Sequence, residues 1–339
     1  MNDAFVEITR GPIVESAHVV SACAVDRSGE PLLRVGDTEM PVYLRSSAKP
    51  FIAAAAVRAG VVERFGLEQP EIAVMAASHS GETFHVEAVR SILRKIGLDE
   101  SALQCGPHAP YNAAAAKGLA ERGEPFTAIH NNCSGKHAGI LALCVLLDCD
   151  PTTYMQLENP AEQRVLEFCA GMTGDAVSDF TLGVDGCGIP VFAVPPLHGA
   201  RAFMRLATLE GIDSDDARAL RVVRDAMLAY PLYIAGTGEF DSLLMETSHG
   251  AIACKGGAEA VHGDAFISGG IGVLVKVKDG GRRAVAPAVL ALLNSLGAVD
   301  LESNQLLAEL AAPVIRNRAG RVVGETRVKR AMIRTSGNC

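Results

Sequence analysis

The distribution of strand and helix patterns along the 339 residues limits the fold more than any other feature of the chain. Residues 1–45 alternate short β-rich runs with turns, as in HVVSACAVDRSGEPLLRVG, and similar runs return from residue 249. Between them lie apolar stretches with helical spacing, such as 48–60, 136–147 and 214–230. Strands at both ends around a helical middle predict an α+β protein.

We expect an antiparallel sheet built from both termini and flanked by helices, with an inserted, mostly helical region. The sheet region would comprise residues 1–45 and 249–339, and the helical region residues 46–248, within one compact unit. Local signals agree with this arrangement, because KDGG at 278–281 is a strong turn sequence. Asn159-Pro160 is typical of the N-cap and first residue of a helix.

Composition excludes several classes of partner. Apolar residues make up 49% and charged residues 21%, as in ordinary globular proteins. A net charge of -8, no long basic run and no Trp argue against nucleic acid and anionic membranes as partners. No apolar run reaches the roughly 20 residues of a membrane helix. Because the N-terminus lacks a signal-peptide pattern and the nine cysteines are odd in number, we expect a cytoplasmic protein with free thiols.

The stretch YLRSSAKPF at 43–51 places a hydroxyl and an amine one helical turn apart. Ser46 and Lys49 are three residues apart, so they share one face of a helix that begins near Ser46. Pro50 fits the first turn, where backbone N–H groups have no intrahelical partner. The pair could act as a nucleophile and its base. The plain alternative is a capping serine and a solvated lysine.

Two later stretches extend this pattern. AVMAASHSGE at 73–82 ends an apolar run in a turn with Ser78, and IACKGGAE places Lys255 before two glycines. The order resembles the S-x-x-K, S-D-N and K-T-G boxes of β-lactamases and penicillin-binding proteins, although the second box departs and the third lacks its hydroxyl. If Lys49 and Lys255 lie in one pocket, each would lower the pKa of the other. A lysine must be neutral to act as a base. The structural alternatives are a helix N-cap and a strand edge.

Cysteine, lysine and histidine cluster in HNNCSGKHAGI at 130–140, and a second cysteine lies between glycines in GVDGCGIP at 183–190. Three interpretations remain open from the residues alone. Cys133 could be a nucleophile with His137 as its base. Cys133 and Cys187 could bind a metal such as zinc. Both could also be small buried residues, which is the commonest role of cysteine.

Taken together, YLRSSAKP, AASHSGE, HNNCSGKHAG, VDGCGIP and the Lys255-Gly256-Gly257 strand resemble the rhizobial-type (class 3) L-asparaginases. The resemblance spans most of the chain. It implies a fold similar to serine β-lactamases and penicillin-binding proteins, a homodimer, and hydrolysis of the amino acid L-asparagine to L-aspartate and ammonia.

The resemblance also implies roles for individual residues. It implies two Ser-Lys tandems, Ser46 with Lys49 and Ser78 with Lys255, and a zinc site formed by Cys133, Lys136 and Cys187. The residues that it implies line the substrate site are Arg45, Asn132, His137 and Asp185. We expect Arg45 to pair with the substrate α-carboxylate and Asp185 to hold the α-amine or a zinc-bound water. Backbone N–H groups near Ser46 and Ala258 are candidates for an oxyanion hole.

Other functions are compatible with the same residues. A cytoplasmic β-lactamase-like peptidase or esterase would share the Ser-Lys pair, and a glutaminase would differ only in the depth of its pocket. A non-catalytic zinc or thiol sensor would use Cys133 and Cys187 and would release no ammonia from asparagine.

Overall fold

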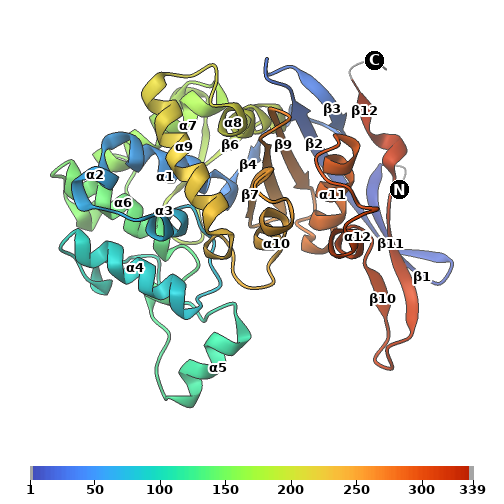
Figure 1. Cartoon of the computed structure of the whole chain (residues 1–339), viewed down its shortest axis with the longest axis horizontal. Helices are drawn as coiled ribbons and strands as arrows, with labels where there is room; N and C mark the ends of the chain where they lie inside the picture. Colours follow the sequence, from blue (N-terminus) through green and yellow to red (C-terminus); the bar gives the residue numbers. More distant parts are fainter. Residues whose placement is uncertain (1–2, 336–339) are drawn as a thin grey trace. The chain divides into compact units, whose positions relative to one another are not determined.

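The computed structural model describes residues 3–335, which form an α+β protein with an antiparallel sheet (Figure 1). This confirms the predicted class, while the likeness to serine β-lactamases stays a prediction. The chain groups into two units. Unit 1 comprises residues 1–42, 194–208 and 256–339, and unit 2 comprises residues 43–193 and 209–255.

The sheet of unit 1 is built from both ends of the chain. Its strands are β1 (Ala4–Arg10), β2 (Ile13–Val25), β3 (Pro31–Val35), β8 (Val261–Phe266), β9 (Ile271–Val277), β10 (Val314–Arg316), β11 (Val322–Val328) and β12 (Arg334–Thr335). The main path runs β10-β11-β1-β2-β9-β8, and β3 pairs with both β2 and β12. The long strand β2 pairs antiparallel with β9, with Cys23 opposite Leu274. Residues 26–30, with the sequence DRSGE, connect β2 to β3.

Helices cover the sheet of unit 1. They are α8 (Pro196–Thr208), α11 (Val285–Ser295) and α12 (Gln305–Ala311), with 3-10 helices η7 (Arg282–Ala284) and η8 (Arg330–Met332). Helix α8 packs against β2, β8 and β9. The approach is close, because a Cβ on Gly272 would lie 2.0 Å from the Ala200 carbonyl oxygen. This packing explains why residues 194–208 join unit 1, although the sequence places them inside the predicted helical region of a single compact unit.

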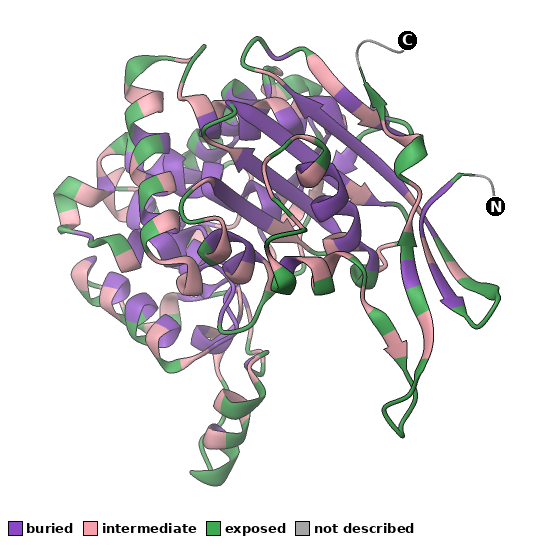
Figure 2. Ribbon diagram, turned by 45° about the vertical axis from the view of Figure 1, so that its right-hand side comes forward, coloured by how far each residue is buried: buried purple, intermediate pink, exposed green. Residues whose placement is uncertain are grey.

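Unit 2 is mostly helical. Its helices are α1 (Lys49–Ala59), α2 (Val61–Phe65), α3 (Gln69–Met75), α4 (Thr83–Lys95), α5 (Ala113–Glu121), α6 (Ser134–Leu146), α7 (Pro160–Thr173), α9 (Ser214–Ala229) and α10 (Phe240–Thr247). Its 3-10 helices are η1 (Arg45–Ala48), η2 (Glu100–Ala102), η3 (Ala128–His130), η4 (Pro151–Thr153), η5 (Val177–Asp179) and η6 (Pro231–Tyr233). Helix α1 is central to the packing, because it contacts α6, α7 and α9 and is buried from Lys49 to Val57 (Figure 2).

Short strands complete unit 2. The hairpin of β5 (Thr181–Val184) and β6 (Pro190–Val194) carries the loop with Asp185 and Cys187, and β6 also pairs with β4 (Val42–Tyr43). Strand β7 (Ile252–Gly257) contains the point where the chain passes from unit 2 to unit 1. The predicted cap at Asn159 is confirmed, because its side chain accepts a hydrogen bond from the Ala161 N–H at 2.9 Å.

Two further expectations concern the whole chain. The cysteines of the described part, all except Cys339, are free thiols, as expected from their odd number. Within residues 3–335, no helix is both long enough and apolar enough to cross a bilayer.

Candidate active site

Lys49 begins helix α1 and is completely buried. The preceding 3-10 turn, residues 45–48, starts from Arg45 in a left-handed conformation, with φ of 50°. Its geometry is held by the Ser47 hydroxyl, which donates to the Leu44 carbonyl oxygen at 2.6 Å. The solvated lysine considered from the sequence is therefore wrong, because the side chain of Lys49 points into the protein.

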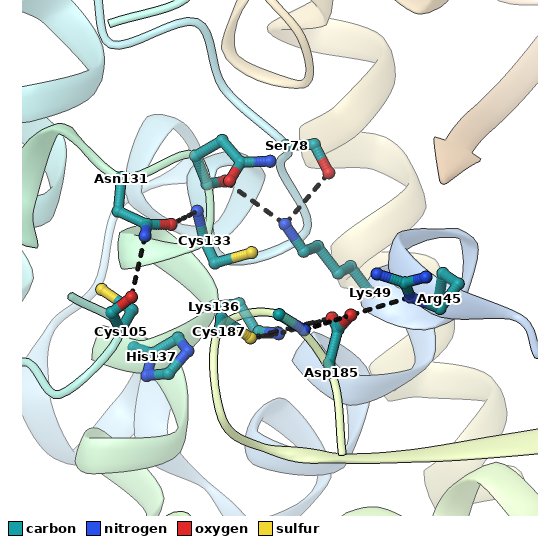
Figure 3. Close-up of polar contacts among 12 residues, drawn as sticks. Arg45, Lys49, Ser78, Cys105, Asn131, Cys133, Lys136, His137, Asp185 and Cys187 are labelled. Carbon is teal, nitrogen blue, oxygen red and sulfur yellow. Dashed lines mark hydrogen bonds and ion pairs between the residues drawn. The ribbon is translucent and has the colours of Figure 1, made fainter. Parts of the chain in front are cut away.

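The Lys49 amine donates to neutral groups (Figure 3). Its Nζ lies 2.6 Å from the Ala77 carbonyl oxygen, 3.0 Å from the Ser78 hydroxyl and 3.3 Å from the Asn132 carbonyl oxygen. Burial lowers the pKa of Lys49 to about 8. Cys133 raises it, and the charges of Lys136 and Lys255 lower it further. A fraction of this amine is therefore neutral near physiological pH.

Ser78 lies just beyond the end of α3, in the turn predicted from the sequence. Its backbone N–H donates to the Ile234 carbonyl oxygen at 2.9 Å, which fixes the turn. Ser78 is half-buried, whereas Ser46 is buried, with 8% of its surface exposed. Among the described residues, the hydroxyl within hydrogen-bond distance of Lys49 is that of Ser78, so the structure brings the lysine of one predicted tandem to the serine of the other.

Lys255 lies in β7 and is 1% exposed. Its Nζ is 3.1 Å from Asp241 Oδ2 at the start of α10. Lys255 and Asp241 thus form a buried ion pair. Asp241 was not predicted from the sequence, because an acidic residue in the first turn of a helix is ordinary and gives no sign of a distant partner. The two lysines thus differ, since Lys49 has neutral partners and Lys255 has a carboxylate.

The turn before α6 places Cys133 and Lys136. Asn131 donates to the carbonyl oxygens of Cys105 and Gly106 and accepts from the Cys133 N–H at 2.9 Å. Lys136 is 2% exposed. Its Nζ lies 3.0 Å from Cys187 Sγ and 3.9 Å from Asp185 Oδ2. The structure therefore joins the two cysteine loops that the sequence singled out. Asn131 was quoted in its motif but was given no role.

The pKa values of the Cys133 and Cys187 thiols are shifted in opposite directions. The hydrogen bond from Cys187 holds the pKa of Cys133 well below its usual value, against burial and together with the charges of Lys136 and Lys49. The same bond and burial raise the pKa of Cys187. Burial lowers the pKa of Lys136, but Cys133, Cys187 and Asp185 outweigh it, and the net shift is upward. These shifts favour a Cys133 thiolate beside a Cys187 thiol and a Lys136 ammonium.

Arg45 and Asp185 form an ion pair. Arg45 Nε lies 2.8 Å from Asp185 Oδ1, with side-chain exposures of 24% and 10%. Burial raises the pKa of Asp185, but Lys136 and Arg45 lower it by more, so the carboxylate is ionised. Both residues were predicted to contact the substrate, and the structure places them in contact with each other at the edge of the cysteine-lysine cluster (Figure 3).

His137 is fully buried on α6, and its Nδ1 is 2.6 Å from the Tyr154 hydroxyl. Burial holds the pKa of His137 well below its usual value, with the charges of Lys136 and Lys49 acting in the same direction. Within residues 3–335 its Nε2 has no hydrogen-bond partner. Tyr154, which the sequence analysis did not single out, therefore orients this histidine.

The last two predicted substrate residues are Asn132 and Ala258. Asn132 contributes its backbone carbonyl to Lys49, at 3.3 Å. Ala258 belongs to unit 1, in the turn between β7 and β8.

Residues 6–328 match the L-asparaginase II family. This match places the protein among the asparaginase-type amidohydrolases. The chain belongs to the L-asparaginase II family, which confirms the resemblance seen in its motifs. No curated protein matches the chain.

Crystal structures of Mglu resemble the chain. The first has a TM-score of 0.39 and 15% identity, and the match covers 85% of this chain and 69% of Mglu. Mglu in its native form with 4.3 M NaCl has a TM-score of 0.39, 16% identity and coverages of 89% and 66%. Its L-glutamate binding form has a TM-score of 0.38, 16% identity and coverages of 82% and 59%. The chain therefore spans about two thirds or less of the Mglu chains.

Proposed function

We propose that the protein hydrolyses L-asparagine to L-aspartate and ammonia through a serine nucleophile activated by Lys49. The observation that carries the proposal is the 3.0 Å contact between the Lys49 amine and the Ser78 hydroxyl. A buried amine with a pKa of about 8 and neutral partners is suited to accept a proton from a hydroxyl.

The chemistry is acyl transfer. Neutral Lys49 takes the proton of the serine hydroxyl while the serine oxygen attacks the side-chain amide carbon of asparagine. The C–N bond then breaks, the lysine returns the proton to the departing ammonia, and an aspartyl ester remains on the serine. Water hydrolyses this ester and releases aspartate.

The contact with Lys49 favours Ser78 as the acylated serine, and Ser46, three residues before the lysine, is the second candidate. The deciding experiment is mass spectrometry of the protein quenched during turnover, with Ser46→Ala and Ser78→Ala as paired variants. We expect an aspartyl adduct on the peptide that contains Ser78. An adduct on Ser46 would reassign the nucleophile, and the absence of ammonia release by the wild type would contradict the function itself.

Substrate recognition is proposed for the Arg45–Asp185 ion pair. An amino acid is a zwitterion, so its carboxylate can replace Asp185 on Arg45 while its ammonium replaces Arg45 on Asp185. This exchange preserves charge balance in a partly buried place, where an unpaired charge is costly. Asn132, His137 and the Ala258 amide remain the other residues that we propose for the substrate site.

Cys133, Lys136 and Cys187 are the residues that we propose to hold zinc. The donor set fits the metal, because thiolates are preferred zinc ligands and a neutral amine nitrogen can complete the N/S set. Their arrangement agrees, since Lys136 Nζ is 3.0 Å from Cys187 Sγ and Cys187 is hydrogen-bonded to Cys133. A bound zinc ion would supply Lewis-acid chemistry and a positive charge.

Measurements on the wild type separate the remaining alternatives. Ammonia release from asparagine excludes a non-catalytic sensor, turnover of nitrocefin would favour the β-lactamase-like enzyme, and parallel assays with glutamine define the preferred side chain. We also propose a cytoplasmic homodimer, for which light scattering of the purified protein gives the mass.

A further inference from the structure

The segment 231–242 is attached to the turn that carries Ser78. The Ile234 carbonyl oxygen accepts from the Ser78 N–H at 2.9 Å, and the Leu232 carbonyl oxygen lies 3.0 Å from His85 Nε2. Beyond Ile234 the two segments also touch, because a Cβ on Gly236 would lie 2.0 Å from the Ser80 hydroxyl oxygen. Gly236 has φ of 127°, so both its backbone and its surroundings require glycine.

Glu82 connects segment 231–242 to the Ser78 turn through hydrogen bonds. Its Oε1 accepts from the Thr237 N–H at 2.9 Å and from the Ser80 hydroxyl at 2.8 Å, and its Oε2 accepts from the Thr237 hydroxyl at 2.9 Å. Partial burial raises the pKa of Glu82, but the hydrogen bonds from Thr237 and Ser80 lower it by more. The ionised carboxylate is therefore the acceptor in all three bonds, and such charge-assisted bonds are about twice as strong as neutral ones.

The segment ends at the partner of Lys255. Asp241 lies four residues after Thr237 and holds the Lys255 amine at 3.1 Å. Ser242 fixes the same end, because its hydroxyl donates to the Pro231 carbonyl oxygen at 2.9 Å and accepts from the Gly236 N–H at 3.2 Å. One short segment thus contacts the Ser78 turn at its beginning and Lys255 at its end.

We propose that Glu82 and Thr237 are positioning residues, which hold segment 231–242 against the Ser78 turn and so fix Lys255, through Asp241, relative to Ser78. The inference rests on the proposed function for its readout in turnover. A misplacement of about 1 Å at a reacting group costs on the order of 10²-fold in rate, so a small shift of this segment matters.

The first test compares two substitutions of one residue. Thr237→Val removes the hydroxyl that donates to Glu82, and Thr237→Ser retains it. Thr247→Val is the matched control, because the Thr247 hydroxyl donates within α10, to the Leu243 carbonyl oxygen at 2.7 Å. We expect Thr237→Val to lower kcat for asparagine about 10- to 100-fold, with little change in KM because Arg45 and Asp185 lie outside the segment. Thr237→Ser and Thr247→Val should stay near the wild type.

A second pair separates hydrogen bonding from charge. Glu82→Gln keeps an oxygen acceptor for the Thr237 N–H, and its amide can donate to the Thr237 hydroxyl, whereas Glu82→Ala removes every bond. Positioning predicts that the glutamine variant retains clearly more turnover than the alanine variant. Equal loss in both, wild-type kcat in Thr237→Val, or equal impairment of Thr237→Ser and Thr237→Val would each overturn the proposal.

Hydrogen exchange gives a readout that does not depend on catalysis. The Ser78 amide, bonded to Ile234, should exchange faster in Thr237→Val than in Thr247→Val. If the wild type released no ammonia from asparagine, the proposed function would fail while faster exchange still supported the positioning role. Equal protection of Ser78 in the two variants would overturn the positioning role whatever the activity.

Discussion

The amine of Lys49 is the group whose protonation should control the reaction. Its pKa is lowered to about 8, chiefly by burial, so its neutral form increases as pH rises through this value. We expect kcat/KM for asparagine to rise with pH and level off above about 8, because only the neutral amine accepts a proton. The measurement is ammonia release across the neutral and mildly alkaline range.

A matched variant identifies the titrating group. Lys49→Met removes the base and should lower kcat by about 10²- to 10⁴-fold, with a residual rate that no longer rises near pH 8. Lys117→Met is the control, because Lys117 is exposed and pairs with the exposed Glu121 at 3.5 Å. A rising limb that survives in Lys49→Met would assign the pH dependence to another group.

Cys133 should contribute to substrate binding more than to bond breaking. The acyl-transfer steps use a serine and Lys49, whereas the thiolate lies in the cluster of Lys136 and Asp185. We therefore expect Cys133→Ser to raise KM for asparagine by a larger factor than it lowers kcat. A folded, metal-free Cys133→Ser protein that binds asparagine normally but has lost all turnover would contradict this assignment.

The sequence identified these residues by motif, but their contacts depend on tertiary structure. Spacing puts Ser46 and Lys49 on one turn, yet the Lys49 amine reaches Ser78, which comes from the turn after another helix. Asp241 and Tyr154 were missed for the same reason, since each completes a site residue that is distant along the chain. Local spacing carries no information about such pairs.

The N-terminal turn of α6 packs directly on α3, and Gly135 makes this possible. A Cβ at Gly135 would lie 2.1 Å from the Val74 carbonyl oxygen, a backbone atom that cannot move aside alone. We expect Gly135→Ala to lower the free energy of unfolding by about 1–3 kcal/mol, the usual cost of overpacking. Because Gly135 precedes Lys136, turnover should fall as well. Chemical denaturation and the ammonia assay measure the two effects.

Two other helical glycines serve as controls. A methyl group at Gly139 would meet the Met75 side chain at 2.9 Å, and a flexible methionine can adjust, so the loss should be smaller. At Gly171 in α7 an added Cβ meets no atom within 4 Å, so alanine should stabilise by up to about 1 kcal/mol. Equal effects at Gly135 and Gly171 would show that helix propensity, not packing, decides.

Elements with strong local signals were predicted, and those defined by packing were not. Asn159-Pro160 marks the start of α7, and the apolar runs after residue 249 are strands, because capping and alternation are local properties. The short hairpin of β5 and β6 was not predicted, although it carries Asp185 and Cys187. Helix α8 lies inside the predicted helical region, but its membership of unit 1 follows from its contacts with the sheet.

The chain passes between its two units at residues 42–43, 193–194, 208–209 and 255–256, so neither unit is a continuous piece of sequence. Every proposed zinc ligand nevertheless lies in unit 2, between residues 133 and 187. A ligand that binds only the folded chain stabilises it, by about 2.7 kcal/mol at a concentration of 100 times Kd. Zinc should therefore raise the Tm of the wild type.

The size of this stabilisation should depend on pH. The pKa shifts favour a Cys187 thiol and a Lys136 ammonium beside the Cys133 thiolate, so we expect zinc binding by two thiolates and a neutral amine to release about two protons. The Tm gain should shrink as pH falls, and calorimetry in buffers of different ionisation enthalpy should count the released protons. Cys133→Ser should abolish the gain, whereas Cys149→Ser, at a half-buried thiol bonded to Asn159, should retain it. A zinc effect that is independent of pH, or that persists in Cys133→Ser, would show that the metal binds elsewhere.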